Sequence, residues 1–248
     1  MKPKAIVLRT AGTNCEYETN HVLKMVGFDA DNVHINELIR GDRKLLDYQL
    51  LVIPGGFSHG DYLGSAKILA NKMAYKLGNE IPEFIEKGNL VLGICNGFQA
   101  LVKAGILPGF GGNYKKQETT LTMNDSGHFQ DEWIEMENVN KGKCVFTKGI
   151  DFTIPCPINH GEGKFVAPEE VMGKLKANDQ VVFKYVKNPN GSYEDIAGIC
   201  DESGMVLGLM PHPEKNFTHL NNPQSTRKEM AGEAAGLAIF RNAFGYFK

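Results

Sequence analysis

The sequence contains few cysteines, one tryptophan, no excess of positive charge and no long apolar stretch. Its five cysteines form no Cys-x-x-Cys pair, which excludes an obvious disulfide framework or zinc ribbon and is typical of a reducing compartment. Apolar stretches such as 90–95 and 205–210 are far too short to span a membrane. A run of only four apolar residues precedes Arg9, too few for a secretory signal. We therefore expect a cytoplasmic protein that does not associate with membranes.

The balanced charge and the absence of two phosphate-binding motifs exclude further classes of function. Lysine and arginine total 27 against 29 aspartates and glutamates, a net charge of −2, whereas nucleic-acid-binding proteins usually carry a basic face. The phosphate-binding fingerprints G-x-x-x-x-G-K-[ST] and G-x-G-x-x-G are also missing. We therefore expect no nucleic-acid partner, and no cofactor or metal on this chain.

The first hundred residues alternate between two patterns. Short apolar runs predict strands, and amphipathic stretches between them predict helices. The expected strands are 5–8, 28–35, 50–53 and 90–94, and the expected helices are 14–27 with Asn14 as its cap, 62–78, 81–87 and 98–104. Continuous apolar strands that alternate with helices predict a parallel sheet covered on both faces.

The second half has a different pattern, with strands joined by turns at 188–191 and 201–204. The expected strands are 117–123, 181–186, 193–200 and 205–210, and an Ala- and Gly-rich last helix is expected over 226–244. No repeat or linker divides the chain. We predict one α/β domain spanning 1–248, an open and mostly parallel sheet flanked by helices, with added antiparallel strands.

The sequence Gly93-Ile-Cys-Asn-Gly97 lies between the expected strand 90–94 and the helix 98–104. In this context a G-x-nucleophile-x-G turn holds its central residue in a strained conformation at the carboxyl end of the sheet. The helix N-terminus favours a thiolate. An isolated cysteine is more often a buried core residue, which is how we interpret the other four. The context favours Cys95 as a nucleophile.

A candidate base lies in Pro211-His-Pro-Glu214, at the end of the expected strand 205–210. The prolines disfavour helix and favour an extended backbone, in which His212 and Glu214 project to the same side. A carboxylate beside an imidazole fixes its tautomer and stabilises its cation, as in catalytic triads. His160 is a competing base. We discount it because only Glu162 offers a carboxylate at comparable spacing, and neighbouring glycine leaves the ring poorly oriented.

Acyl transfer also needs N–H donors for the developing oxyanion. The backbone amide of Asn96, which follows the nucleophile, is expected to supply one. A second donor could come from Gly55-Gly56, just past the strand 50–53, although this pair fits a plain strand-ending turn equally well.

Four motifs together resemble a class I (triad-type) glutamine amidotransferase domain: GICNGFQ, PGGF near residue 55, NHGEG at 159–163, and the terminal PHPE. The resemblance covers essentially the whole chain and implies a flavodoxin-like sheet. It implies Cys95 as nucleophile, His212 as general base and acid, and Glu214 as its orienter. The remaining implied site residues are the oxyanion-hole amides of Gly56 and Asn96, and Gln99, Asn159 and Gly161, which match positions that hold glutamine.

Three further segments, 9–16, 56–63 and 124–133, resemble the glutaminase subunits of phosphoribosylformylglycinamidine (FGAM) synthase. The resemblance implies that L-glutamine is hydrolysed and that ammonia passes to a large synthetase subunit, which uses ATP and Mg²⁺ to make FGAM from formylglycinamide ribonucleotide in purine synthesis. It also implies a small accessory subunit. Asp61 and Tyr62 are expected to face the partner.

Three other functions remain open from the sequence. The chain could be the glutaminase of a different synthetase. It could be a peptidase or deglycase of the related cysteine-elbow fold, but such enzymes commonly have His after the nucleophile, where this chain has Asn96. A non-catalytic regulatory module is the third possibility, and the intact Cys95, His212 and Glu214 argue against it.

Overall fold

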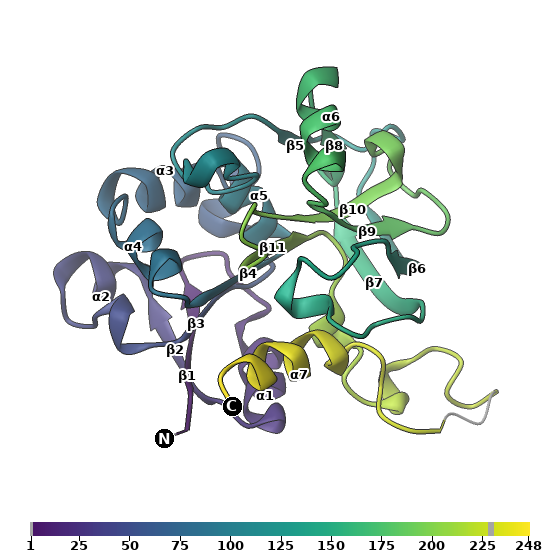
Figure 1. Ribbon diagram of the computed structural model, residues 1–248. Helices are drawn as coiled ribbons and strands as arrows, with labels where there is room; N and C mark the ends of the chain where they lie inside the picture. The colour runs from purple at the N-terminus through teal and green to yellow at the C-terminus, as the bar shows by residue number, and fades with distance from the viewer. Residues whose placement is uncertain (1, 228–230) are drawn as a thin grey trace.

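A computed structural model describes residues 2–227 and 231–248, and within them a nine-stranded sheet forms the centre of the molecule (Figure 1). Its strands, in spatial order, are β2 (Asp29–His34), β1 (Lys4–Arg9), β3 (Leu50–Ile53), β4 (Leu90–Ile94), β11 (Val206–Leu209), β10 (Ile196–Cys200), β9 (Val181–Tyr185), β6 (Gln130–Asn138) and β7 (Ile154–His160). The short strands β5 (Thr120–Thr122) and β8 (Lys164–Val166) pair separately.

Strand direction divides the sheet into two parts. From β2 to β11 every neighbouring pair is parallel, and from β11 to β7 every pair is antiparallel. The order β2-β1-β3-β4-β11 is that of the flavodoxin-like fold. Every residue of β3 and β4 is buried, as expected for strands covered on both faces. The predicted fold class is therefore confirmed.

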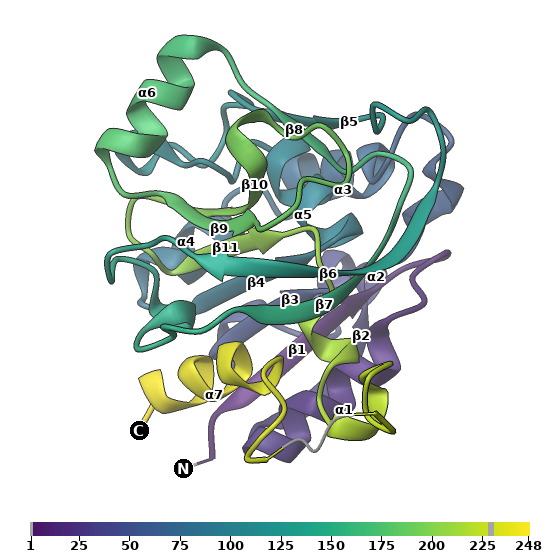
Figure 2. The same ribbon diagram turned by 90° about the vertical axis from the view of Figure 1, so that its right-hand side faces the viewer.

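Helices cover both faces of the parallel part. They are α1 (Glu16–Val26), α2 (Ile35–Arg40), α3 (Lys67–Lys76), α4 (Glu80–Glu86), α5 (Asn96–Lys103) and α7 (Leu237–Tyr246). A further helix, α6 (Glu169–Ala177), follows β8 and lies away from the parallel strands in Figure 2. Figures 1 and 2 show α1 and α7 together on one side of the sheet and α3 and α5 on the other. None of the helices in the described residues has the length and apolarity needed to cross a membrane.

Some expected elements differ from the structure. The helix expected from 62 begins at Lys67 instead, because Asp61 and Ala66 have left-handed backbones (φ 51° and 57°) that interrupt a helix. Helix α1 begins one residue after Cys15, so Asn14 is not its cap. The run 205–210 forms β11, which is antiparallel to β10 but parallel to β4. The elements expected from the sequence do not include strands β6, β7 and β8 or helices α2 and α6.

The last helix is shorter than expected. Of the predicted range 226–244, residues 228–230 lie outside the described residues, and residues 231–236 form turns that lead into α7. The expected close approach of this segment to a neighbour is present at Gly236, where a Cβ would overlap the carbonyl oxygens of Pro213 and Asn216. Gly236 therefore serves close packing, and the helix begins only after it.

The parallel strands place several chain segments at one edge. β4 is hydrogen-bonded between β3 and β11, with Gly93 opposite both Ile53 and Gly208. The segments that follow these strands therefore emerge side by side.

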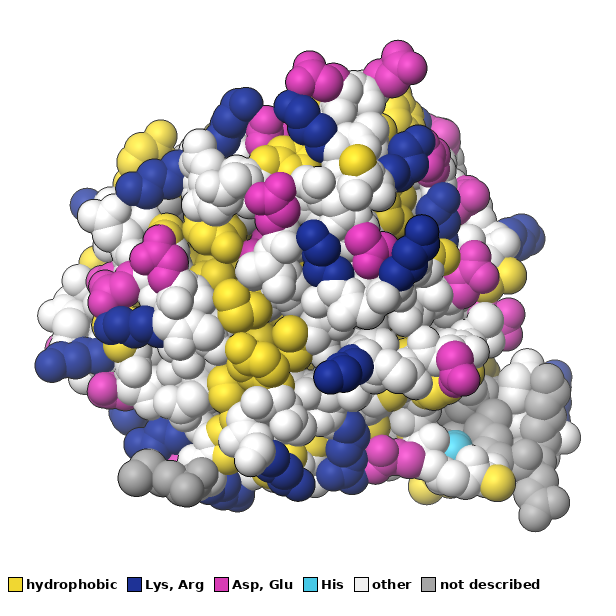
Figure 3. Space-filling view, viewed as in Figure 1, with side chains coloured by type: hydrophobic (Ala, Val, Ile, Leu, Met, Phe, Trp, Pro, Cys, Tyr) yellow, Lys and Arg dark blue, Asp and Glu magenta, His cyan; other side chains and the backbone are white. Residues whose placement is uncertain are grey.

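On the face shown in Figure 3, basic and acidic side chains are interspersed, and no region of a single charge dominates. The functional site is therefore expected at the edge of the sheet where β3, β4 and β11 end.

Candidate active site

Cys95 occupies a strained turn between β4 and α5. Its φ of 51° and ψ of −106° lie outside the regions that ordinary residues adopt, and its amide donates to the Leu209 carbonyl at 2.8 Å. Glycine is needed at position 97, because a Cβ there would overlap the carbonyl oxygen of Ile53. A strained residue held by its surroundings in this way is typical of a nucleophile elbow.

His212 and Glu214 form a buried pair just after β11. Nδ1 of His212 lies 2.5 Å from Oε1 of Glu214, and the two residues are 1 % and 0 % exposed. The backbone is not extended as expected, since Pro213–Lys215 form a short 3₁₀ turn. Proline fits the first position of such a turn because its missing N–H is not needed there. The backbone amide of His212 donates to the Pro157 carbonyl at 2.9 Å, which fixes the pair against β7.

The imidazole of His212 faces the thiol of Cys95. Burial by itself would lower the pKa of His212, but the charges of Glu214 and Cys95 outweigh burial and raise this pKa well above its ordinary value. Among the described residues, Nε2 of His212 has no hydrogen-bond partner. The ring is therefore held by Glu214 on one side and free on the other to exchange a proton with Cys95.

Two backbone amides are available as oxyanion donors. Asn96 is the first residue of α5, where an amide has no acceptor within the helix. Gly56 has a φ of 141°, and among the described residues its amide has no backbone acceptor. The amide of the next residue, Phe57, donates to the Gly12 carbonyl instead. Gly56 and Cys95 line the same cavity. The arrangement therefore fits the expected oxyanion hole.

That cavity has a volume of about 230 Å³. Part of its lining comes from the end of β7 and the segment after it, and part from the loop after β3. Two aromatic or apolar side chains from the β5–β6 region also line it. The residues are Gly56, Phe57, Asp61, Ser65, Cys95, Gln99, Met123, Phe129, Asn159, His160, Gly161 and Glu162. The structure thus brings the predicted Gln99, Asn159 and Gly161 to the same cavity as the nucleophile.

Gln99 and Asn159 contribute in different ways. The Gln99 amide donates to the Glu162 carbonyl at 2.7 Å and accepts from the Asn96 side chain at 3.0 Å, so it fixes the cavity wall. The carbonyl oxygen of Asn159 lies 3.7 Å from Sγ of Cys95. Its side-chain amide donates instead to Asp131 at 2.5 Å. Asn159 therefore faces the nucleophile with its backbone.

His160, the competing base, is held firmly and not loosely as expected. Its Nδ1 lies 3.1 Å from Oδ1 of Asn124, and a Cβ on Gly163 would overlap its ring. Burial, with a smaller contribution from the charge of His212, lowers the pKa of His160 to about 4. Glu162 directs its carboxylate away, to the Ser65 amide at 3.2 Å. His160 is thus neutral and has no carboxylate partner within the described part of the chain, which disfavours it as a base.

Asp61, Glu162 and Lys103 form a polar network that sequence reasoning missed. Asp61 was expected to face a partner, but its carboxylate points inward and accepts from the Ala66 amide at 2.9 Å and the Asn96 side chain at 3.2 Å. Burial raises the pKa of Asp61. Lys103 Nζ donates to the Ser65 carbonyl at 2.5 Å and lies 3.4 Å from Glu162. The network fastens the loop after β3 to the elbow helix. In the sequence, only the proximity of Asp61 to the GGF motif and of Glu162 to the NHG motif could have indicated this network.

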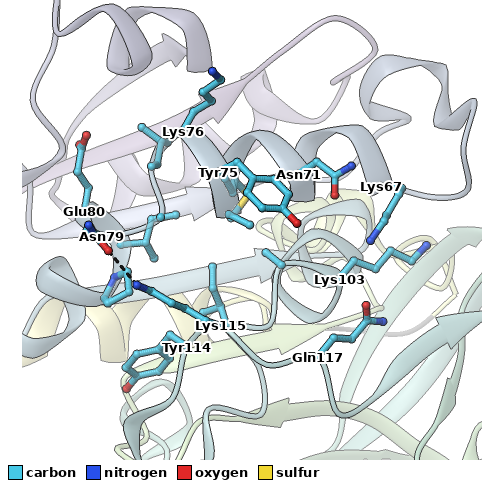
Figure 4. A pocket seen from close by; sticks show the side chains of 18 residues that line it. Lys67, Asn71, Tyr75, Lys76, Asn79, Glu80, Lys103, Tyr114, Lys115 and Gln117 are labelled. Carbon is cyan, nitrogen blue, oxygen red and sulfur yellow. Dashed lines mark hydrogen bonds between the residues drawn. The ribbon is translucent and has the colours of Figure 1, made fainter.

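A larger hollow of about 640 Å³ lies beside α3 and α5 (Figure 4). Lys67, Lys103 and Gln117 line it, and Lys115 Nζ donates to Asn79 at 2.9 Å. No cysteine, serine or histidine lines it among the described residues. This hollow therefore has no nucleophile–base pair, and the smaller cavity at Cys95 remains the candidate site.

One group of three potential metal ligands is present in the described part of the chain: Cys15, His212 and Glu214, with ligand atoms within 4.8 Å of one another. Two of the three are the candidate base and its orienter, which bond directly to each other. We therefore treat the group as part of the catalytic centre.

Comparison with known proteins supports this interpretation. A family model for the CobB/CobQ-like glutamine amidotransferase domain matches residues 2–247. The phosphoribosylformylglycinamidine synthase subunit PurQ of Methanococcus maripaludis is 42 % identical over 99 % of this chain and 97 % of that protein. The subunit of the same name from Dehalococcoides mccartyi is 44 % identical over 98 % and 96 %.

Solved structures agree with the sequence relatives. A chain in the structure of PurLQS from Thermotoga maritima is 35 % identical, with a TM-score of 0.79 and complete coverage of both chains. A putative GMP synthase component from Thermoplasma acidophilum has a TM-score of 0.59 at 16 % identity over 99 % of this chain and 94 % of that one, which shows a shared fold. The match over nearly all of its length shows that this chain belongs to the family of CobB/CobQ-like glutamine amidotransferase domains.

Proposed function

We propose that this chain is the glutaminase component of an FGAM synthase, which hydrolyses L-glutamine and delivers ammonia to a separate synthetase. One observation carries the proposal: Cys95 sits on a strained elbow at the wall of a cavity, with the buried His212–Glu214 pair beside it. Relatives about 40 % identical over their full length are named FGAM synthase subunits, which supports this choice of synthetase.

The reaction follows from the positions of these groups. His212 takes the thiol proton of Cys95 as the sulfur forms a bond to the side-chain amide carbon of glutamine, and the amides of Gly56 and Asn96 stabilise the oxyanion. Collapse of this intermediate breaks the carbon–nitrogen bond, and His212 gives this proton to the departing nitrogen, which leaves as ammonia. His212 then takes a proton from a water molecule, whose oxygen attacks the carbonyl carbon of the γ-glutamyl thioester. The carbon–sulfur bond breaks, glutamate is released, and His212 returns the proton to the Cys95 sulfur. Glu214 stabilises the imidazolium in both halves.

The released ammonia must reach its acceptor before water protonates it, so the partner is expected to cover the cavity mouth. Exposed apolar side chains surround this mouth: Phe57 and Phe129, with ring centroids 6.1 Å apart, and Met123. Tyr62 and Leu63 lie on the same loop as Phe57 and are 86 % and 71 % exposed. An exposed apolar patch of this kind is typical of a protein interface. We propose that the synthetase docks here, and that ATP and Mg²⁺ bind to the synthetase. A small accessory subunit is expected to complete the complex.

The test compares two nitrogen sources in the complex assembled from this chain, the synthetase and the accessory subunit. We expect Cys95→Ala to abolish FGAM synthesis from glutamine, because no thioester can form, and to preserve synthesis from ammonium salt. Cys200→Ala, which removes a buried thiol from β10, is the matched control and should retain both activities.

Loss of both activities in a folded Cys95→Ala complex would show that the cysteine serves the synthetase and not amide hydrolysis. Mass spectrometry after treatment with a diazo-ketone analogue of glutamine gives a second test. A single adduct on Cys95 is expected, and an unlabelled Cys95 would favour a non-catalytic module.

A further inference from the structure

The outer edge of β7 holds the segment that carries the candidate base. β7 is the last strand of the described sheet, so its backbone pairs with β6 on one side only. On the other side, the Pro157 carbonyl accepts from the His212 amide at 2.9 Å. The Pro155 carbonyl accepts from Nδ2 of Asn216 at 2.7 Å. The segment that follows β11 is therefore fastened along this edge of β7.

Asn159 lies two residues further along β7, and its side-chain amide has a partner at each end. Nδ2 donates to Oδ1 of Asp131 at 2.5 Å. Oδ1 accepts from Nζ of Lys215 at 2.8 Å. Asp131 is opposite Asn159 in the register of β6 and β7, and Lys215 directly follows Glu214 in the 3₁₀ turn. The amide thus joins β6 to the turn that carries the base. We call Asp131, Asn159 and Lys215 the Asn159 clamp.

Opposite charges face the two ends of this amide. The Asp131 carboxylate attracts the amide hydrogens, and the Lys215 ammonium attracts the amide oxygen. Hydrogen bonds of this kind are stronger than those between neutral groups. Turning the amide by 180° would place its hydrogens against the ammonium and its oxygen against the carboxylate. The Asn159 side chain therefore has a single favourable orientation.

Lys215 depends on this contact in turn. Its side chain is half-buried, and within the described part of the chain Oδ1 of Asn159 is the single hydrogen-bond partner of its ammonium. A partly buried charge that loses its partner is costly, because little water replaces the lost bond. The bond is therefore expected to persist in solution.

The clamp holds the part of β7 that forms the cavity wall. The Asn159 carbonyl lies 3.7 Å from Sγ of Cys95, and Asn159, His160 and Gly161 all line the cavity. β7 ends at His160, and the ends of elements open more readily than their middles. Asp131 and Lys215 are not among the lining residues. Their effect on the cavity therefore passes through Asn159.

The reacting groups are held by other contacts. The strained elbow holds Cys95, and Oε1 of Glu214 holds the His212 ring. None of these contacts involves the side chain of Asp131 or Lys215. Loosening the clamp should therefore change the shape of the cavity and leave the nucleophile and base in place.

We propose that Lys215 and Asp131 are positioning residues, which hold Asn159 in place as a wall of the glutamine pocket. They contribute to the binding of glutamine and not to the steps that break bonds. The inference rests on the proposed glutaminase function, because the pocket that the clamp shapes is the one proposed to hold glutamine.

The first experiment measures glutamate release by the assembled complex as the glutamine concentration is varied. We expect Lys215→Met to raise KM about tenfold, the usual effect of one hydrogen bond to a charged group, while kcat changes less than about twofold. Lys215→Arg keeps a cationic donor and should have a KM close to that of the wild type. Lys176→Met, which removes an exposed ammonium from α6, is the matched control and should leave KM unchanged.

A double-mutant cycle tests whether Asp131 and Lys215 act through the same amide. Asp131→Ala should raise KM only about threefold, because this carboxylate is exposed, and Asp131→Asn, which keeps an acceptor, should restore it. Either single change frees the Asn159 amide, so the double variant should have a KM within about twofold of that of Lys215→Met. Independent contributions would multiply to about thirtyfold. If Lys215→Met does not fold, Asp131→Ala and its rescue by Asn decide the matter.

The diazo-ketone analogue of glutamine gives a second measure of binding. The concentration that gives half-maximal inactivation should rise in Lys215→Met in parallel with KM, and the maximal rate of inactivation should stay the same. This split separates a loss of binding from a loss of nucleophile reactivity.

Several results would overturn the proposal while the wild type remains an active glutaminase. One is an unchanged KM in folded Lys215→Met. Another is a loss of kcat with an unchanged KM, which would mean that Lys215 supports Glu214 and not the pocket. A double variant with the multiplied effect would show that the two residues act separately. A wild-type complex that makes FGAM from ammonia but never from glutamine would instead contradict the proposed function, and this inference with it.

Discussion

At the scale of single residues, the proposed reaction gives Cys95, His212 and Glu214 separate roles. We expect His212→Ala to lose nearly as much glutaminase activity as Cys95→Ala, because the same imidazole serves as acid and base. Glu214→Gln should retain roughly a hundredfold more activity than either, since removing an orienter usually costs less than removing a nucleophile or base. Initial rates of glutamate release by the complex measure all three. A nearly normal His212→Ala with an inactive Glu214→Gln would make Glu214 the base.

His160 links this site to the stability of the fold. Its pKa is lowered to about 4 in the folded chain, so between about pH 6.5 and 4 the unfolded chain binds a proton that the folded chain does not. Stability therefore falls as the pH decreases through this window. At about 1.4 kcal/mol per pKa unit, the loss from this one residue is about 3 kcal/mol.

Denaturant unfolding at pH 4.5 and pH 7 measures this contribution. We expect the wild type to lose more stability between these pH values than His160→Gln, which cannot take up the proton. The same substitution at the exposed His128 controls for loss of a histidine. Equal losses in the wild type and His160→Gln would show that other groups cause the pH dependence.

At the scale of elements, the junction between β4 and α5 needs a glycine at one position. We expect Gly97→Ala to destabilise the chain by about 1–3 kcal/mol and to reduce glutaminase activity, because the new Cβ overlaps the Ile53 carbonyl and displaces α5 from β3. Gly173→Ala is the matched control. It lies within α6 with no atom within 4 Å of the new Cβ, so it should stabilise by about 0.5–1 kcal/mol.

Denaturant unfolding and rates of glutamate release measure both variants. A Gly97→Ala chain with wild-type stability and activity would show that α5 can shift without cost, and that the elbow does not depend on this contact.

The loop from Gly56 to Ala66 is the second element that decides the site. His59, Asp61 and Ala66 all have left-handed backbones, with φ between 51° and 57°, which costs free energy for residues other than glycine. Contacts to Asn96 offset this cost: the Ser58 amide donates to its side chain at 3.1 Å, and Asp61 accepts from it at 3.2 Å. The conformation of the loop thus depends on its contacts with the elbow helix.

At the scale of the whole molecule, this coupling would link the proposed docking surface to the proposed oxyanion donor. Tyr62 and Leu63 are exposed on the loop that also carries Gly56. We expect the isolated chain to be a poor glutaminase and its kcat to rise about 10²–10³-fold in the complex, the usual effect of one oxyanion donor. Docking of the synthetase would rotate the peptide plane that carries the Gly56 amide so that its N–H points toward the substrate. Glycine permits this rotation at low conformational cost.

Glutamate release is measured for this chain alone and with the synthetase, the accessory subunit, ATP and formylglycinamide ribonucleotide. Tyr62→Ser with Leu63→Ser should weaken this activation, whereas Tyr75→Ser, an exposed tyrosine on α3, serves as the control. An equal kcat under all conditions would mean that the site is already complete in the free chain.

The fold was predictable where a sequence pattern is compatible with only one type of structure. The expected strands 50–53 and 90–94 match β3 and β4 residue for residue, because fully buried strands form continuous apolar runs. Strands β6 and β7 were missed because polar residues and prolines interrupt their apolar pattern. Their position depends on pairing with β9 and with each other, which local periodicity does not report.

The sequence by itself determined the nucleophile elbow, the His212–Glu214 pair and the parallel half of the sheet. Each of these depends on residues close together in the chain: two glycines around a cysteine, a histidine two residues from a glutamate, and apolar runs between helices. The elbow and the apolar strands follow from short-range sterics and spacing. The spacing of His212 and Glu214 predicted their contact but not the 3₁₀ turn on which it forms.

Only the tertiary structure decided that the Asn159 carbonyl faces Cys95, that Asp61 points inward to Asn96, and that Cys15 lies against His212. These contacts join segments that are 35 to nearly 200 residues apart in the sequence. Their geometry depends on the order and register of strands in the sheet and on which polar groups burial leaves to be satisfied. No local pattern contains that information, because it arises only when the strands are packed together.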